Sequence, residues 1–246
     1  MMPLPKRPSL ILPDRPYVAF PCAMPIWKLR RCWKWWFEES LMYNLSHFKV
    51  KDPLKILAFM KEHSFVTLCG ADAQGKPVAT HVPVFVDQVE GELILSGHIM
   101  RSSDHHLAFE ENPQVMAVFH GAHAYISASW YTKPDQASTW NYMTVHASGG
   151  IRFTDQQALL DILKRTTDHF ENNPDSPAGF DKMGEEYVHR LSKAIVAFEI
   201  KVDNIDHVFK LSQNKDDVTY EQIINKLLEG DAQAQAIAAE MRKSRK

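Results

Sequence analysis

The sequence lacks the patterns that mark the commonest catalytic and membrane proteins. Its three cysteines are widely spaced and form no CxxC pair, so they imply neither a disulfide framework nor a zinc knuckle. No apolar run approaches the roughly 20 residues that span a membrane. HExxH, GxSxG, P-loop and GxGxxG motifs are absent, so metalloprotease, hydrolase, NTPase and Rossmann mechanisms lack support. We expect a cytoplasmic protein in a reducing compartment, without a membrane span.

The twelve histidines do not predict a metal site. None belongs to a metal-ligand motif, and no cysteine pair supports them. Adjacent helical residues such as His105 and His106 point to different faces and do not easily share one ion. We therefore expect neither a metal nor a haem.

Positive charge is concentrated at the start of the chain. The formal net charge is −2, yet residues 1–41 carry seven Lys and Arg against three acids, and the remainder carries 21 basic and 27 acidic residues. A protein that binds the DNA backbone normally shows a basic face. DNA contact is therefore not supported by the charge of the body, and it would have to rest on a local patch or a partner.

Residues 1–41 also differ in composition from the rest. Seven of the fourteen prolines lie at or before Pro25, and the basic, aromatic stretch Trp27–Phe37 follows. A signal peptide is disfavoured because the apolar core and the small-residue cleavage site are missing, whereas tryptophans beside Lys and Arg leave an interfacial membrane helix open. We expect a disordered extension, or upstream sequence translated from a start site placed too early. One composite domain is expected over residues 42–246.

Beyond Asp52 the hydrophobic pattern predicts an α+β chain dominated by antiparallel strands. Asp52-Pro53 is typical of a helix N-cap followed by proline. Short alternating segments between turn residues then predict an antiparallel sheet or barrel. The expected strands are Phe65–Cys69, Val78–Asp87, Glu92–His98, Gln114–His120, His123–Tyr131, Thr139–Ala147, Ile151–Phe153 and Ile195–Val202, with a tight hairpin at Gly121-Ala122. The expected later helices are Ser103–Glu111, 154–171 and Glu185–Ala194, and two C-terminal helices divided near Gly230, with capping boxes opening at Thr154 and Thr219.

The joint between the strand Glu92–His98 and the following helix is the first candidate site. Arg101 offers a guanidinium fork, Ser102 and Ser103 offer hydroxyls, and a helix N-terminus offers backbone N–H groups. These groups together suit a phosphate monoester. The alternative from spacing alone is that Ser103 is only an N-cap and Arg101 only a surface residue.

An aromatic strand is the second candidate. In an extended conformation Trp140, Tyr142 and His146 share one face, which suits stacking on a flat heterocycle. The same face is equally typical of barrel packing or of a contact between subunits, where Trp and Tyr are frequent. The segment His123–Tyr131 is also rich in aromatics, and the loop Lys210–Asn214 is polar without a general motif.

Seven blocks of the sequence, in order, resemble the PaiB-like negative transcriptional regulators. They are Met42-Tyr43 with Phe48; Ala79–Pro83; Ser96–His98 with Arg101; Phe119–Gly121 with Ala124–Ser127; Ser129–Tyr131; Thr139–Tyr142 with Val145-His146; and Lys210–Asn214. The resemblance covers residue 42 to the C-terminus. It implies an FMN-binding split β-barrel with peripheral helices, a homodimer, and a role as a negative transcriptional regulator.

The resemblance also implies positions for the flavin. The block with Ser96, His98 and Arg101 looks like the phosphate site of split barrels, and Ser102 and Ser103 lie beside it. The backbone of Thr80, His81 and Val82 looks like the strand that meets the ring, and Trp140 and Asn141 are further candidates. The chain departs from the family pattern at Met100–Asp104, where Ala-Arg-Ala-Asn-Pro is usual, so an asparagine amide is missing. It also departs at Ala128 and at Ala137-Ser138.

Two function classes stay open at this point. One is a regulatory protein in which FMN is a sensor or structural ligand. The other is a flavin-dependent oxidoreductase that uses NAD(P)H and a small acceptor, because split barrels bind that cofactor without a Rossmann motif. Whether the protein is an enzyme is not decided by the sequence.

Overall fold

The computed structural model describes residues 45–245, which belong to the unit Met42–Lys246. The expectations for residues 1–41 lie outside the described residues. Within the described part, one sheet of seven antiparallel strands carries the fold, in the order β2-β1-β5-β6-β7-β4-β3. The strands are β1 Phe65–Ala71, β2 Pro77–Pro83, β3 Phe85–Val89, β4 Glu92–Met100, β5 Gln114–Ile126, β6 Thr139–Phe153 and β7 Ile195–Lys210.

Alternation along the strands separates a buried face from a face nearer solvent. On β6, Asn141, Met143 and Val145 are buried, whereas Trp140 and Tyr142 point to the opposite side. Period-two alternation is what a strand with one face on the core requires. The buried side chains of the sheet, including Leu68, Phe119, Phe198 and Ile200, form one continuous hydrophobic core with the C-terminal helices.

The sheet curls so that its two ends approach each other. β2 and β3 are the outermost strands of the hydrogen-bonded order, yet β2 contacts β4. At this approach a Cβ on Gly97 of β4 would lie 2.8 Å from the Pro83 carbonyl oxygen of β2. Only glycine allows backbones to come so close. The predicted class, a split β-barrel with mainly antiparallel strands and peripheral helices, is confirmed.

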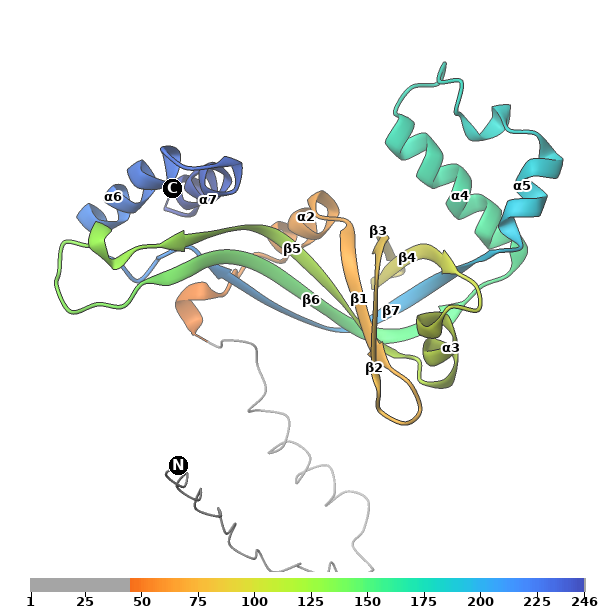
Figure 1. Ribbon diagram of the computed structural model, residues 1–246, viewed down its shortest axis with the longest axis horizontal. Coiled ribbons are helices and arrows are strands. Elements are labelled where there is room, and N and C mark those ends of the chain that lie inside the picture. The colour runs from red at the N-terminus through yellow and green to blue at the C-terminus, as the bar shows by residue number, and fades with distance from the viewer. Residues whose placement is uncertain (1–44, 246) are drawn as a thin grey trace, which may run out of the picture. The chain divides into compact units, whose positions relative to one another are not determined.

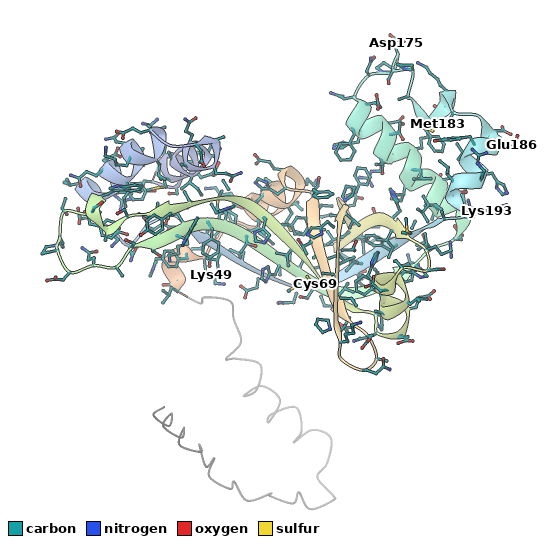
Figure 2. All side chains as sticks on the ribbon, viewed as in Figure 1. Lys49, Cys69, Asp175, Met183, Glu186 and Lys193 are labelled. Atoms are coloured by element: carbon teal, nitrogen blue, oxygen red, sulfur yellow. The ribbon has the colours of Figure 1, made fainter. Side chains whose placement is uncertain are left out.

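Helices lie at both ends of the long central strands (Figure 1). α6, Asp217–Leu228, and α7, Ala232–Ser244, pack on each other, and α7 packs against β5. α4, Gln156–Glu171, and α5, Glu185–Ser192, form a unit at the other end; Asp175 marks its connecting loop and Lys193 its return to β7 (Figure 2). α2, Pro53–Glu62, precedes β1, and α3, Asp104–Glu111, follows β4.

Several expected boundaries are wrong. Gly121-Ala122 is not a hairpin: β5 runs through it, and these two residues stand opposite Met143 alone as a bulge. Neither residue has the positive φ of a two-residue hairpin turn. β6 likewise runs through Gly149-Gly150, and β7 extends beyond Val202 to Lys210. The expected strand Val78–Asp87 breaks at Val84 into β2 and β3.

Two helix starts are also shifted from their expected capping boxes. Asp155, not Thr154, accepts the capping hydrogen bond of α4, and Asp216, not Thr219, accepts that of α6. A nearby aspartate, one residue after Thr154 and three residues before Thr219, takes the place of the threonine because both residue types are good caps. The helix predicted at Ser103–Glu111 is confirmed, with Ser103 as its N-cap.

Candidate functional site

The candidate phosphate site lies where β4 ends and α3 begins. Three residues, Arg101, Ser102 and Ser103, make this connection, and Ser102 has a positive φ of 60°. A left-handed residue turns the chain sharply, so Arg101 and the start of α3 lie in one short segment. Arg101 and Ser102 are exposed, and Ser103 is half-buried.

Ser103 is engaged in capping α3. Its hydroxyl donates to the Met100 carbonyl at 2.8 Å and accepts from the His106 backbone N–H at 3.3 Å. The His105 ring lies 2.9 Å away through Nε2. Because a hydroxyl has a single proton, Ser103 would give up its bond to Met100 in order to donate to a phosphate. This part of the alternative interpretation, an N-cap, is confirmed.

Arg101 is anchored by backbone and keeps most of its guanidinium for a ligand. Its backbone N–H donates to the Ala194 carbonyl at 2.9 Å, and its guanidinium donates through Nη2 to the Ile195 carbonyl at 3.2 Å. A guanidinium has five N–H donors. Among described residues, the remaining donors have no hydrogen-bond partner.

Asp104 is a feature that the motif analysis missed. Its carboxylate occupies the first turn of α3 and accepts from the backbone N–H of His105 at 2.8 Å. That bond, followed by one from the His105 ring, holds the pKa of Asp104 below its usual range. The carboxylate is therefore charged at neutral pH, next to where a phosphate would bind. The sequence signal was the Ser-Asp pair at a predicted helix start.

The strand residues upstream of Arg101 are more buried. Ser96 is buried, and His98 is half-buried. Burial lowers the pKa of His98, because a low-dielectric surrounding disfavours the imidazolium form. His98 is therefore a neutral imidazole at pH 7.

The predicted ring strand lies near this joint. Thr80, His81 and Val82 belong to β2, whose one neighbour in the sheet is β1. β2 contacts both β4 and α3 (Figure 1). Thr80 is half-buried, His81 is exposed and Val82 is buried. The curled sheet therefore brings Thr80–Val82 and Ser96–Ser103 to the same region.

Trp140 and Asn141 are not brought to that region within one chain. Arg101 sits beside Ala194 and Ile195 at the start of β7, whereas Tyr142 pairs with Lys210 at its end. β7 has 16 residues, or roughly 50 Å of extended strand at about 3.3 Å per residue.

Asn141 has a structural environment. It is fully buried, its Oδ1 accepts from the Ser212 hydroxyl at 3.0 Å, and its Nδ2 lies 3.5 Å from Met241 Sδ. It therefore ties β6 to the loop after β7 and to α7. Ser212 belongs to the polar segment Lys210–Asn214, for which the sequence suggested no role.

Trp140 lines a pocket at the far end of the central strands. Its ring is 52% exposed and meets Tyr125 edge-on, with centroids 5.8 Å apart. The pocket has a volume of about 570 Å³, and Trp130 and the α6–α7 turn complete it.

The shared face expected on the strand Thr139–Ala147 is present, because Trp140, Tyr142 and His146 point away from the core.

The donors at the β4–α3 joint fit the phosphate of FMN. Arg101 supplies a charge-assisted fork, Ser102 a hydroxyl, and α3 the positive end of its dipole. Asp104 opposes an anion at the same place. These donors thus resemble those of a phosphate-binding strand-to-helix joint, with the charge of Asp104 as the one unfavourable feature.

Comparison with known proteins identifies the family. Residues 42–204 match the family described as "Putative FMN-binding domain". The chain is 34% identical over 186 residues to the protease synthase and sporulation protein PAI 2 of Bacillus subtilis (strain 168), which covers 76% of this chain and 89% of that protein. The chain belongs to this PaiB-like FMN-binding family, and the family assignment supports FMN as its cofactor.

Two solved structures are also similar. A conserved hypothetical protein from Mycobacterium tuberculosis has a TM-score of 0.48 at 14% identity, covering 69% of this chain and 91% of its own. An FAD and heme binding protein from Mycobacterium smegmatis has a TM-score of 0.46 at 15% identity, covering 65% of this chain and 72% of its own.

Over residues 45–245, no helix is long and apolar enough to cross a membrane. Within the same range, no cluster of three or more His, Cys, Asp or Glu side chains is arranged to hold a metal ion.

Proposed function

We propose that this protein is a cytoplasmic FMN-binding homodimer that acts as a negative regulator of transcription. The observation that carries the flavin site is the β4–α3 joint, where Arg101 keeps guanidinium donors for an anion. The regulatory role is supported by the PaiB-like family and by the relative named for protease synthesis and sporulation. The chemistry that FMN supplies when bound is reversible electron uptake by its ring.

In this proposal the chain's own residues bind and orient the flavin. Arg101, Ser102 and Ser103 hold the phosphate, with Ser96 and His98 beneath them on β4. The β2 backbone at Thr80–Val82 lies along the ring. The neutral His98 adds a hydrogen-bonding group without adding charge.

A second subunit supplies the aromatic residues. Trp140 cannot reach the β4–α3 joint of its own chain across the length of β7. Tyr125 and Trp140 are each about half exposed, and such aromatics are enriched in protein interfaces. A two-fold contact would use this surface twice, and it would bring Trp140 of one subunit toward the flavin of the other.

Replacement of Arg101 tests the flavin site. Arg101→Ala should weaken FMN binding by about 1.5–3 kcal/mol, the range for hydrogen bonds to a charged group. Titration of FMN fluorescence measures both dissociation constants. Arg190→Ala on α5, also an exposed arginine, should leave the constant unchanged. Equal constants for wild type and Arg101→Ala would remove Arg101 from the site.

Sedimentation tests the dimer. If flavin bridges two subunits, FMN must strengthen dimerisation and dimerisation must strengthen FMN binding to the same extent. Analytical ultracentrifugation at low protein concentration, with and without FMN, measures the shift. A monomer that binds FMN with undiminished affinity contradicts the shared site.

An anaerobic spectrum separates the regulator from an oxidoreductase. A regulator that uses FMN as a ligand should keep the oxidised flavin bands when NADH or NADPH is added. Rapid bleaching of those bands, and their return with an added acceptor, would instead establish the oxidoreductase alternative.

A further inference from the structure

A small pocket lies between the sheet and α4, separate from the residues proposed to hold FMN. Its volume is about 250 Å³. β3 forms one wall, the C-terminal half of α4 forms the other, and the end of α2 lies at the rim. This places residues more than 100 positions apart in the sequence around one space.

The interior of the pocket is apolar and partly aromatic. Pro83, Val84 and Phe85 line it from the sheet, and Phe170 lines it from α4. The Phe170 side chain is 61% exposed although it is a large apolar group. A cavity of about 150 Å³ accepts benzene, so this pocket has room for one ring with a polar substituent.

The charged residues at the pocket leave a positive excess. Arg165 forms two hydrogen bonds to Asp87, at 2.6 and 2.8 Å, and its guanidinium lies 3.9 Å from the centre of the Phe85 ring. The negative charge of the Asp87 carboxylate is therefore balanced by Arg165, whose hydrogen bond lowers the pKa of Asp87. Lys61 also faces Asp87 but forms no hydrogen bond with a described residue.

We propose that this pocket binds a small amphipathic carboxylate, with its apolar body against Phe85 and Phe170 and its anionic group at Lys61. Apolar walls with one or two placed polar groups are typical of small-molecule sites. The charge of Arg165 is balanced by Asp87, so Lys61 is the cation whose charge is unbalanced among the described residues that line the pocket. This ligand site goes beyond the proposed function, and it gives the protein a second small molecule to respond to.

The test uses benzoate as the probe on the full chain. Isothermal titration calorimetry should detect binding of benzoate, and much weaker binding of benzyl alcohol and benzylamine, which keep the ring and change the charge. Lys61→Met should weaken benzoate about tenfold, the loss of one charge-assisted contact. Lys55→Met changes another exposed lysine of the same helix and should have no effect.

Phe170→Ser provides a second variant that does not disturb the core, because the side chain is largely exposed. It should also weaken benzoate. Equal benzoate affinity in wild type and Lys61→Met, or benzylamine bound as tightly as benzoate, would overturn the proposal, as would no benzoate binding at all. Arg101→Ala should leave benzoate binding unchanged, so failure here is distinguishable from failure of the flavin site.

Discussion

Asp104 places a carboxylate in the first turn of α3, beside the proposed phosphate site. The PaiB-like pattern that this segment resembles usually has proline at this position, so the aspartate is a departure from that pattern. Anions near a helix N-terminus are attracted by its dipole, and here the protein's own carboxylate takes that place. The affinity for FMN is therefore expected to be below what Arg101 and the helix alone would allow.

Asp104→Asn should bind FMN more tightly than wild type by a few-fold. The amide oxygen can still accept the hydrogen bond from the His105 backbone, while the repulsion of the phosphate is removed. Because the group is exposed, the gain should shrink as salt is added. FMN titrations at low and high ionic strength measure this. Asp155→Asn, at the N-cap of α4, is the control; an unchanged affinity in Asp104→Asn would contradict the electrostatic account.

Four histidines link stability to pH. Burial lowers the pKa values of His98, His106, His146 and His207. The unfolded chain takes up these protons near pH 6.5, and the folded chain takes them up only at lower pH. Stability is therefore full above about pH 6.5 and falls as pH decreases from there toward the folded values.

Urea unfolding between pH 8 and pH 5 checks this expectation. The midpoint should be constant at the upper end and should decrease below about pH 6.5. His98→Gln should make the urea midpoint less dependent on pH, since a glutamine side chain does not titrate. His189→Gln, an exposed histidine on α5, should not. A midpoint that rises on acidification would show that the buried histidines gain rather than lose protons on folding.

At the scale of elements, β6 and β7 form the longest pairing of the sheet, and an irregularity interrupts it. The register shifts between Ser148 and Gly149, so that one residue of β7 has no direct partner. A Cβ on Gly149 would lie 1.9 Å from the Lys201 carbonyl oxygen, whereas a Cβ on Gly150 would meet no atom within 4 Å. The two adjacent glycines therefore have different roles.

Gly149→Ala should lower the free energy of unfolding by about 3 kcal/mol or more, because the backbone of β7 must move to relieve the clash. Gly150→Ala should be neutral or slightly stabilising, since it only restricts the unfolded chain. Urea unfolding compares the two variants. If their midpoints are the same, the close approach of β6 and β7 at Gly149 is wrong.

At the scale of the whole molecule, the family match begins at residue 42. The described core residues begin at Phe48. A protein that starts at Met42 contains all of them, and it also contains every residue proposed to hold FMN.

The chain shortened to residues 42–246 should unfold at the same temperature as the full chain and bind FMN equally well. No periodic apolar pattern in residues 1–41 predicts a contribution to the core. Thermal unfolding and FMN titration of both proteins check this. A melting temperature several degrees lower in the shortened protein would show that the first 41 residues pack against the domain.

Local patterns in the sequence determined the kind of elements and the place of the candidate phosphate site. Alternating Val and Thr residues predicted strands, and Ser103 predicted the start of α3, because side-chain periodicity and capping act over a few residues. The resemblance in seven ordered blocks predicted the split barrel and the cofactor. None of these inferences needed contacts between distant residues.

Only the tertiary structure decided which distant residues meet. Gly121-Ala122 reads as a hairpin from its composition, but β5 pairs with β6 on both sides of it, and the Phe59 ring packs against Gly121. The separation of Trp140 from Arg101 depends on the length and register of β7, and the pocket beside Lys61 depends on Arg165 reaching Asp87 across 78 positions. Such outcomes follow from the curl of the sheet and the closest approaches of its backbone, which no short stretch of sequence encodes.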